Sequence, residues 1–388
     1  MEGWIGTCPS AAQIAANLFV GINGILIAGL QPLLLGALAH EGRITAPQIG
    51  EAATAELLMM GAACAYAGAH WKAEHLRAIA IVAAVILGGL DLLSVRGSGS
   101  TITLLRALAG VPSGILIWVT IAMIARTPTP ERWSGIYLTI QTLAQFLVAA
   151  ALTAWVVPTH GANGGFAALA GLCAVTALIA ALLLPNSFAP LVASETTSSL
   201  PPRRGLVALT ACFLYSAFII GVWVYVEPLS HQHGHSATVA GTAVSISLAC
   251  QVLGGSAATI FASRLRWFPA VLVCSVLNVG CLVAFANLSA VPAYLATAGV
   301  FGFLWLFVLP FLVPMVIAAD PSRRSALLIG GAQLLGGSLG PLFASFVVTD
   351  ADVRGALVFG LCALALSVII MIALGRRPVA DAGTIGSS

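Results

Sequence analysis

The sequence alternates between long apolar stretches and short polar ones along almost its whole length. A bilayer core about 30 Å thick needs roughly 20 apolar residues per helix. Measured against that length, the apolar stretches predict twelve transmembrane helices and no β-structure. Their approximate ranges are 12–39, 51–69, 78–95, 101–125, 134–157, 164–184, 206–228, 236–260, 268–287, 291–318, 325–348 and 355–374.

The polar stretches divide these helices into two equal groups. The longest one runs from Pro185 to Arg204 and leaves six predicted helices on either side. Basic loops near residues 72 and 129 recur near 265 and 322, at an offset of about 193 residues, as expected of a duplicated six-helix unit. We therefore expect an N-terminal six-helix bundle (1–184), a cytoplasmic linker (185–205), a C-terminal six-helix bundle (206–374) and a cytoplasmic tail (375–388).

Composition supports a membrane protein. Of the 388 residues, 60% are hydrophobic and 7% are charged, against about 45–50% and about 25% in soluble domains. These values exclude a soluble enzyme and a disordered chain. The net charge of +3 also excludes a nucleic-acid partner, because tracking phosphates needs a strongly basic face.

The positions of Lys and Arg predict the orientation, because these residues concentrate in short cytoplasmic loops. With twelve helices, the loops on the side of the two termini hold 12 of the 16 basic residues. The opposite loops hold Arg43, Arg96 and Arg354, and Arg106 falls within a predicted helix. We expect both termini to be cytoplasmic, and the protein to be integral to a bacterial inner membrane.

Three short motifs resemble the major facilitator superfamily of transporters. They are Arg106-Ala-Leu-Ala-Gly110-Val-Pro-Ser-Gly114 in the fourth helix, Tyr225-Val-Glu227-Pro-Leu229 at the end of the seventh and Gly336-Gly-Ser-Leu-Gly340-Pro341 in the eleventh. The second resembles drug and sugar efflux members, including the arabinose-efflux-like group. The resemblance covers nearly the whole chain and implies two pseudo-symmetric six-helix bundles, with Arg106 on a helix that faces the central cavity.

The chain also departs from the family pattern. The loop signature after the second helix is reduced to the segment from Gly68 to Arg77. The Gly-Pro antiporter motif of the fifth helix is missing, and Tyr137, Gln141 and Gln145 stand in that helix instead.

Three ionisable residues fall inside the predicted helices of the first half: Glu56, Asp91 and Arg106. Such residues are functional candidates because each costs several kcal/mol in lipid. At 1.5 Å per residue, Glu56 and Arg106 each lie roughly 8 Å from the outer surface, and Asp91 lies in the outer third. An Arg–carboxylate pair would offset their desolvation. One hypothesis is that Arg106 binds an anionic substrate or couples transport to a carboxylate's protonation; the other is a structural ion pair.

Glu227 is a further candidate, at the outer end of the seventh predicted helix. It is either a proton site at the cavity mouth or an exposed helix-end carboxylate. His231, His233 and His235 follow it at alternating positions, a spacing open to pH sensing or metal binding. Because no Cys lies near them, we expect no metal site there.

Uncharged polar and aromatic residues complete the candidate pocket. Tyr137, Gln141 and Gln145 recur every four residues and therefore share one helix face. The others lie along helices one, seven, eight, ten and eleven: Asn17, Asn23, Gln31, Tyr215, Trp223, Gln251, Trp305 and Gln333. Each amide is alternatively a contact between helices, and each Trp either stacks on a ligand or packs ordinarily.

These features predict a secondary transporter, not an enzyme. The sequence has no Gly-x-x-x-x-Gly-Lys-Ser/Thr nucleotide-binding segment, and no cofactor is expected. We expect proton-coupled efflux of a small amphiphilic or anionic organic molecule by a monomer. The alternatives are an uptake symporter or uniporter of a small organic acid, and a non-transporting receptor or assembly subunit on the same scaffold.

Overall fold

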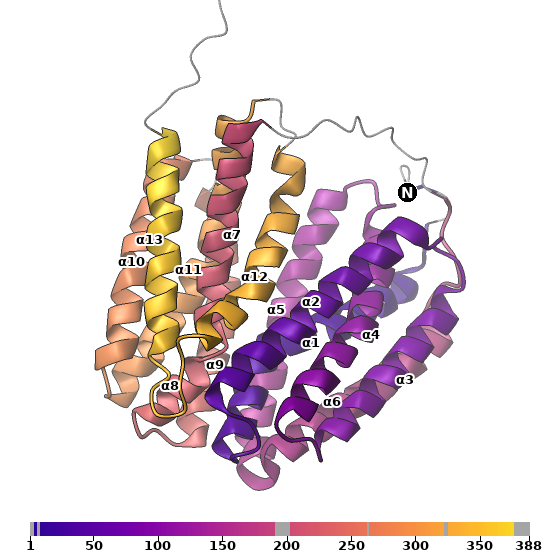
Figure 1. Cartoon of the computed structure of the whole chain (residues 1–388). Helices are drawn as coiled ribbons and strands as arrows, with labels where there is room; N and C mark the ends of the chain where they lie inside the picture. Colours follow the sequence, from indigo (N-terminus) through magenta and orange to yellow (C-terminus); the bar gives the residue numbers. More distant parts are fainter. Residues whose placement is uncertain (1–3, 6–7, 191–201, 262–263, 322–324, 376–388) are drawn as a thin grey trace, which may run out of the picture.

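The computed structural model describes residues 4–5, 8–190, 202–261, 264–321 and 325–375. The tail from 376 onward, Arg323, Arg324 and residues 191–201 of the predicted linker lie outside these residues. The described part is helical (Figure 1). The N-terminal half comprises α1 (Ala11–His40), α2 (Ala46–His70), α3 (Leu76–Ser94), α4 (Ser100–Ile124), α5 (Pro130–Ala151), the π-helix η1 (Leu152–Val156) and α6 (Val157–Leu183).

The C-terminal half begins with α7 and ends with α13. Its elements are α7 (Arg203–Trp223), α8 (Val226–Gln232), α9 (Ala237–Phe261), α10 (Trp267–Asn287), α11 (Val291–Ala319), the 3-10 turn η2 (Ser325–Leu328), α12 (Ile329–Ser345) and α13 (Gly355–Gly375). Figure 1 shows the two halves side by side, with the start of α1 and the end of α13 at the same end of the molecule. Following the predicted orientation, we call the opposite end the outer end.

The structure agrees with twelve membrane spans. Ten helical stretches are long and apolar enough to cross a bilayer. One of them, Arg132–Leu183, has 52 residues and contains two spans, because the chain breaks at Gly161, whose φ is 59°. The remaining span is α12, which has only 17 residues and is preceded by η2.

Several predicted helix ends differ from the structure. α5 ends at Ala151, where η1 follows, and α6 begins at Val157, seven residues before its predicted start. α7 ends at Trp223, and a break at Val224 and Tyr225 precedes the short helix α8. Pro228 lies in the first turn of α8, where its missing N–H costs no helical hydrogen bond. α2 begins at Ala46, five residues before the predicted start, because Thr45 and Gln48 form a capping box there.

Glycines allow the helices of each half to approach closely. A Cβ at Gly110 or Gly114 of α4 would overlap the carbonyl oxygens of Glu56 and Met60 in α2. In the C-terminal half, Gly336 of α12 stands in the same relation to the backbone of α7. Small residues at four-residue spacing are typical of close helix contacts in membranes. The α2–α4 contact fixes the depth at which Glu56 meets Arg106.

We predict that Gly114→Ala lowers the thermal stability of the purified protein, because the new methyl group would force α4 away from α2. Overpacking of this kind costs about 1–3 kcal/mol. The matched control is Gly61→Ala in α2, where nothing lies within 4 Å of the added Cβ. Thermal unfolding in detergent checks the pair; equal unfolding temperatures for the two variants would contradict the described packing.

Candidate functional site

Arg106 lies at the centre of a buried polar cluster in the N-terminal half. Its Nη2 donates to Asp91 Oδ1 at 3.0 Å and to Ser94 Oγ at 2.6 Å, both on α3. Its Nη1 pairs with Glu56 Oε1 of α2 at 3.3 Å. Arg106 and both carboxylates are at most 2% exposed. The structure therefore brings together the three ionisable residues that the sequence placed at a similar depth.

Two further residues complete this cluster. Gln31 of α1 donates from Nε2 to Glu56 Oε2 at 3.4 Å, and the Arg106 guanidinium lies 4.8 Å from the ring centre of Phe166 in α6. Because α2 begins early, Glu56 is about 15 Å along its helix at 1.5 Å per residue, deeper than the roughly 8 Å expected. The cluster joins all the helices of this half except α5.

The cluster is enclosed within the N-terminal half. The cavity beside it has a volume of only about 10 Å³ and is lined by residues of this half alone, among them Asn23, Ser113 and Cys173. Space of that size holds about one water molecule. Arg106 therefore lies inside the bundle and does not face the boundary between the halves. The family resemblance had implied that it faces a central cavity, and this expectation is wrong for the described conformation.

The charges of the cluster do not balance. One guanidinium faces two carboxylates, so the site carries a net charge of −1 when both acids are ionised. Burying an uncompensated charge costs several kcal/mol, whereas one proton shared by the two acids would make the site neutral. The arrangement is chemically suited to take up and release a single proton.

The two halves meet at the middle and outer parts of their helices. Among the described residues, hydrogen bonds between the halves join the Ala46 N–H to Asp350 Oδ1 at 2.6 Å and Trp223 Nε1 to the Ala28 carbonyl oxygen at 3.3 Å. A Cβ at Gly50 of α2 would overlap the Pro341 carbonyl of α12. The described conformation is closed at the outer end.

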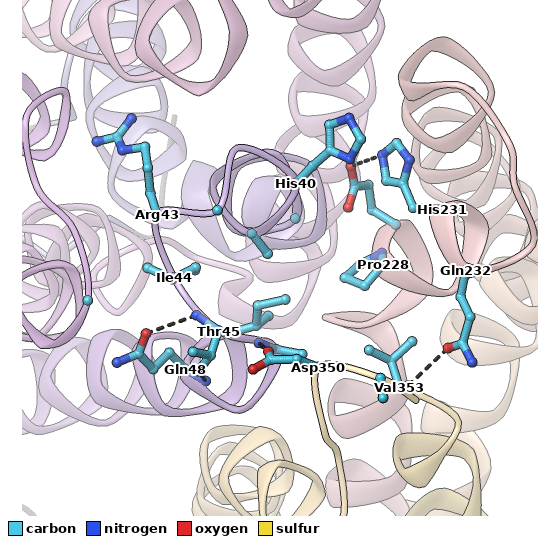
Figure 2. Close-up of a pocket in the computed structure, with 18 residues that line it drawn as sticks. His40, Arg43, Ile44, Thr45, Gln48, Pro228, His231, Gln232, Asp350 and Val353 are labelled. Atoms are coloured by element: carbon cyan, nitrogen blue, oxygen red, sulfur yellow. Dashed lines mark hydrogen bonds and ion pairs between the residues drawn. The ribbon is translucent and has the colours of Figure 1, made fainter.

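A cavity of about 760 Å³ lies at this outer boundary (Figure 2). Residues from the end of α1, the start of α2, α8 and the loop before α13 line it, including His40, Thr45, His231 and Asp350. Glu227 belongs to its wall but is itself buried. Its Oε1 accepts a hydrogen bond from His231 Nε2 at 2.9 Å, so it is not the exposed helix-end carboxylate of the alternative interpretation.

His233 and His235 serve the local structure. His233 Nε2 donates to the Phe285 carbonyl and His235 Nε2 to the Ser289 carbonyl, each at 2.7 Å. His235 Nδ1 also hydrogen-bonds the Ser230 hydroxyl at 3.0 Å. Both side chains tie the segment after α8 to the α10–α11 connection. Three of their four ring nitrogens hydrogen-bond protein oxygens. No metal-binding group of three or more side chains occurs within the described residues.

The polar face of α5 packs on α1. Tyr137 donates from its hydroxyl to the Gly21 carbonyl at 2.9 Å, and Gln145 donates to the Ile25 carbonyl at 3.0 Å. Gln141 lies half-buried between them. In this conformation, Tyr137 and Gln145 make the interhelical contacts that the sequence left as an alternative to lining a cavity.

The remaining candidates on α1 also contact their own half. Asn17 Nδ2 donates to the Val119 carbonyl at 3.5 Å, and Asn23 Nδ2 lies 3.4 Å from Cys173 Sγ. Gln31 belongs to the Arg106 cluster. The polar side chains of α1 thus attach it to α4, α6 and α2.

The two candidate tryptophans, Trp223 and Trp305, lie against each other at the boundary between the halves. Trp223 and Trp305 have ring centres 5.5 Å apart in an edge-to-face arrangement. Trp223 is fully buried and Trp305 half-buried. Elsewhere in the C-terminal half, Tyr215 accepts from Asn278 Nδ2 at 3.4 Å, Gln251 is buried on α9, and Gln333 is half-buried on α12.

Sequence reasoning missed four residues of these sites. Ser94 and Phe166 complete the Arg106 cluster, while Gly36 and His40 of α1 face Glu227 and His231. Only His40 carried a usable signal, as an ionisable residue directly after the first predicted helix (12–39).

Comparisons with known proteins show which solved structures have a similar fold. No protein-family model matches the sequence, and no curated protein matches it. Solved structures do match: a bacterial homologue of the human lysosomal transporter Spinster, in an inward-facing and occupied conformation, has a TM-score of 0.65 at 13% identity, with 94% of this chain and 96% of that chain covered. The nucleoside transporter NupG gives 0.63 at 12% identity, with 95% and 99% covered.

At this identity the likeness concerns the fold. The chain has the same twelve-helix fold as these transporters, so the fold class predicted from the sequence is confirmed. The matched proteins are transporters and not enzymes. Assignment to the drug and sugar efflux branch stays a prediction.

We predict that Arg106→Met strongly destabilises the protein, because Glu56 and Asp91 would lose their cation inside the bundle. Removing one partner of a buried pair costs about 3–5 kcal/mol. Adding Glu56→Gln and Asp91→Asn to this variant should recover part of the loss. Arg96→Met, at an exposed position, is the control for unfolding measurements. An Arg106→Met protein as stable as the control would contradict the buried cluster.

Proposed function

We propose that this chain is a secondary transporter that exports a small amphiphilic or anionic organic molecule by alternating access, coupled to protons. One observation carries this proposal. The chain has the fold of known transporters, and the hydrogen bonds between its two halves, among the described residues, lie at the middle and outer parts of the helices. Separation of those contacts would open the outer end. In this proposal the protein works as a monomer in a bacterial inner membrane, with both termini in the cytoplasm.

The Arg106 cluster is the proposed coupling site. Protonation of Glu56 or Asp91 would weaken one of the two ion pairs that hold the guanidinium. Because Gln31 connects Glu56 to α1, this change would reach the helix that contacts the C-terminal half. The enclosed position of Arg106 favours coupling over direct binding of the substrate.

The proposed substrate site lies at the boundary of the halves, beside Trp223 and Trp305. The half-buried face of Trp305 supplies an apolar aromatic surface, and edge-to-face packing on Trp223 fixes its orientation. Such a surface suits a flat or amphiphilic ligand. A thermal-shift screen of organic acids and amphiphiles, with nucleosides included because of the NupG likeness, would identify ligands.

We predict that a ligand found in this screen crosses the membrane of liposomes containing the purified protein when a pH gradient is imposed. Movement against the proton flow would indicate export by antiport, and movement with it would indicate uptake by symport. Flux that ignores the gradient would remove proton coupling and favour a uniporter. Binding without any flux would favour a receptor or assembly subunit.

We predict that Glu56→Gln abolishes gradient-driven flux but preserves exchange of labelled for unlabelled ligand without a gradient. The amide keeps the size of the side chain but cannot take up the proton. Arg106→Lys should lose gradient-driven flux about tenfold or more, equivalent to about 1.4 kcal/mol, because an ammonium cannot span two carboxylates as a guanidinium does. Wild-type coupled flux in both variants would refute the coupling site.

A further inference from the structure

Glu227 presents an acid from one half of the protein to the backbone of the other. Its side chain is 3% exposed, and Oε2 has no hydrogen-bond partner among the described residues. A Cβ at Gly36 of α1 would overlap this oxygen. Only glycine therefore leaves room for the carboxyl group when the outer end is closed.

His231 presents a base at the same place. Its Nε2 hydrogen-bonds Glu227 Oε1 at 2.9 Å. Its ring stacks on that of His40 in α1, with centres 4.3 Å apart and planes 12° apart; Figure 2 shows the labelled His40 and His231 next to each other. Both members of the acid–base pair on α8 thus contact α1, the neighbouring helix of the N-terminal half.

Apart from His40, whose ring stacks on His231, the other ionisable groups around this pair have hydrogen-bond partners of their own. Arg43 donates to the carbonyls of Ser94, Val95 and Gly97, Tyr294 of α11 donates to the Val226 carbonyl, and Asp350 accepts from Ala46. Asp352 binds Gln232, and His235 binds Ser289. Helix α9, which also packs on α8, carries no ionisable residue except Cys250. His231 is therefore the hydrogen-bonded titratable partner of Glu227.

One proton decides the charge of the pair. With a single proton shared between carboxylate and imidazole, the pair is neutral overall and the hydrogen bond is retained. Without it, a carboxylate that lacks a donor for Oε2 would stay buried against α1, and leaving such a group unsatisfied is costly. Separation of α8 from α1 would let water reach it.

We propose that Glu227 and His231 form a second proton-binding site, at the boundary of the halves, and that the proton bound there holds the outer end closed. The proton comes from the outer solution, since His231 lines the outer cavity and its side chain is 16% exposed. Loss of this proton favours separation of α8 from α1.

The direction of the pH dependence follows from His231. Its hydrogen bond to Glu227 raises the pKa of His231 above the usual value, against the opposing effect of burial. The stabilisation of the closed outer end is therefore fully present below the ordinary histidine pKa of about 6.5. It is lost as the pH rises through the raised pKa. The site rests on the proposed alternating access but needs neither the Arg106 cluster nor a substrate.

The test measures the distance between spin labels at Ser98→Cys and Ala351→Cys, two exposed positions at the outer ends of opposite halves. The background lacks the more accessible cysteines Cys8, Cys64, Cys250 and Cys362. Without substrate, in nanodiscs, the short-distance population should dominate at about pH 6 and shift to longer distances at about pH 9. With Glu227→Gln, the short distance should persist at both pH values.

A second pair of variants tests the steric fit of the Glu227 side chain against Gly36. Gly36→Ala should give the long distance at both pH values, and adding Glu227→Ala should restore the short one by removing the overlapping carboxyl group. A wild-type distribution that ignores pH, or a pH shift that persists in Glu227→Gln, would overturn the proton site. Failure of Glu227→Ala to rescue Gly36→Ala would overturn the contact itself. Each result leaves substrate flux through the Arg106 site separately testable.

Discussion

The structure depends on how one guanidinium is accommodated among apolar helices. Arg106 is 1% exposed and is held by Glu56, Asp91 and Ser94. In a medium that solvates charge poorly, these partners are what makes the burial of Arg106 tolerable. They come from neighbouring helices, so satisfying one charge fixes α2, α3 and α4 relative to one another. The excess carboxylate makes the same cluster sensitive to a proton.

Helix α1 connects this cluster to the rest of the molecule. Gln31 reaches Glu56, while Ala28 accepts from Trp223 and His40 stacks on His231 in the other half. Gly36 lies between these contacts and allows Glu227 to approach the backbone. A shift of α1 would therefore alter both acidic sites together. In our proposal, the Arg106 cluster and the Glu227–His231 pair both act on the opening of the outer end through α1.

The sequence was sufficient for the helices because a bilayer makes length and hydropathy decisive. Twelve predicted spans have counterparts in the structure, and most of their ends agree within a few residues. Two of the exceptions have clear local causes: the capping box at Thr45 extends α2, and the break after Trp223 separates α8 from α7. The site was less predictable. Their positions in apolar stretches identified Glu56, Asp91 and Arg106 as candidates. The family resemblance, however, predicted that Arg106 faces a central cavity, and in the structure it does not.

Contacts between distant segments account for what the sequence could not predict. Tyr137 and Gln145 share a face as expected, yet only the position of α1 decides that the face makes helix contacts in this conformation. The match of Gly36 to Glu227 joins residues of different halves, and a glycine in an apolar stretch gives no sign of such a partner. Hydropathy reports which residues enter the membrane, whereas packing decides which of them meet.

Infrared spectroscopy of the purified protein tests the central claim most directly, because a protonated carboxyl group has a stretching band distinct from that of a carboxylate. At neutral pH and without substrate, our account predicts a protonated-carboxyl band that loses intensity in Glu56→Gln or in Asp91→Asn, while an exposed substitution such as Glu74→Gln leaves it unchanged. A band that neither buried substitution alters would show that the Arg106 cluster holds no proton, and would contradict the account.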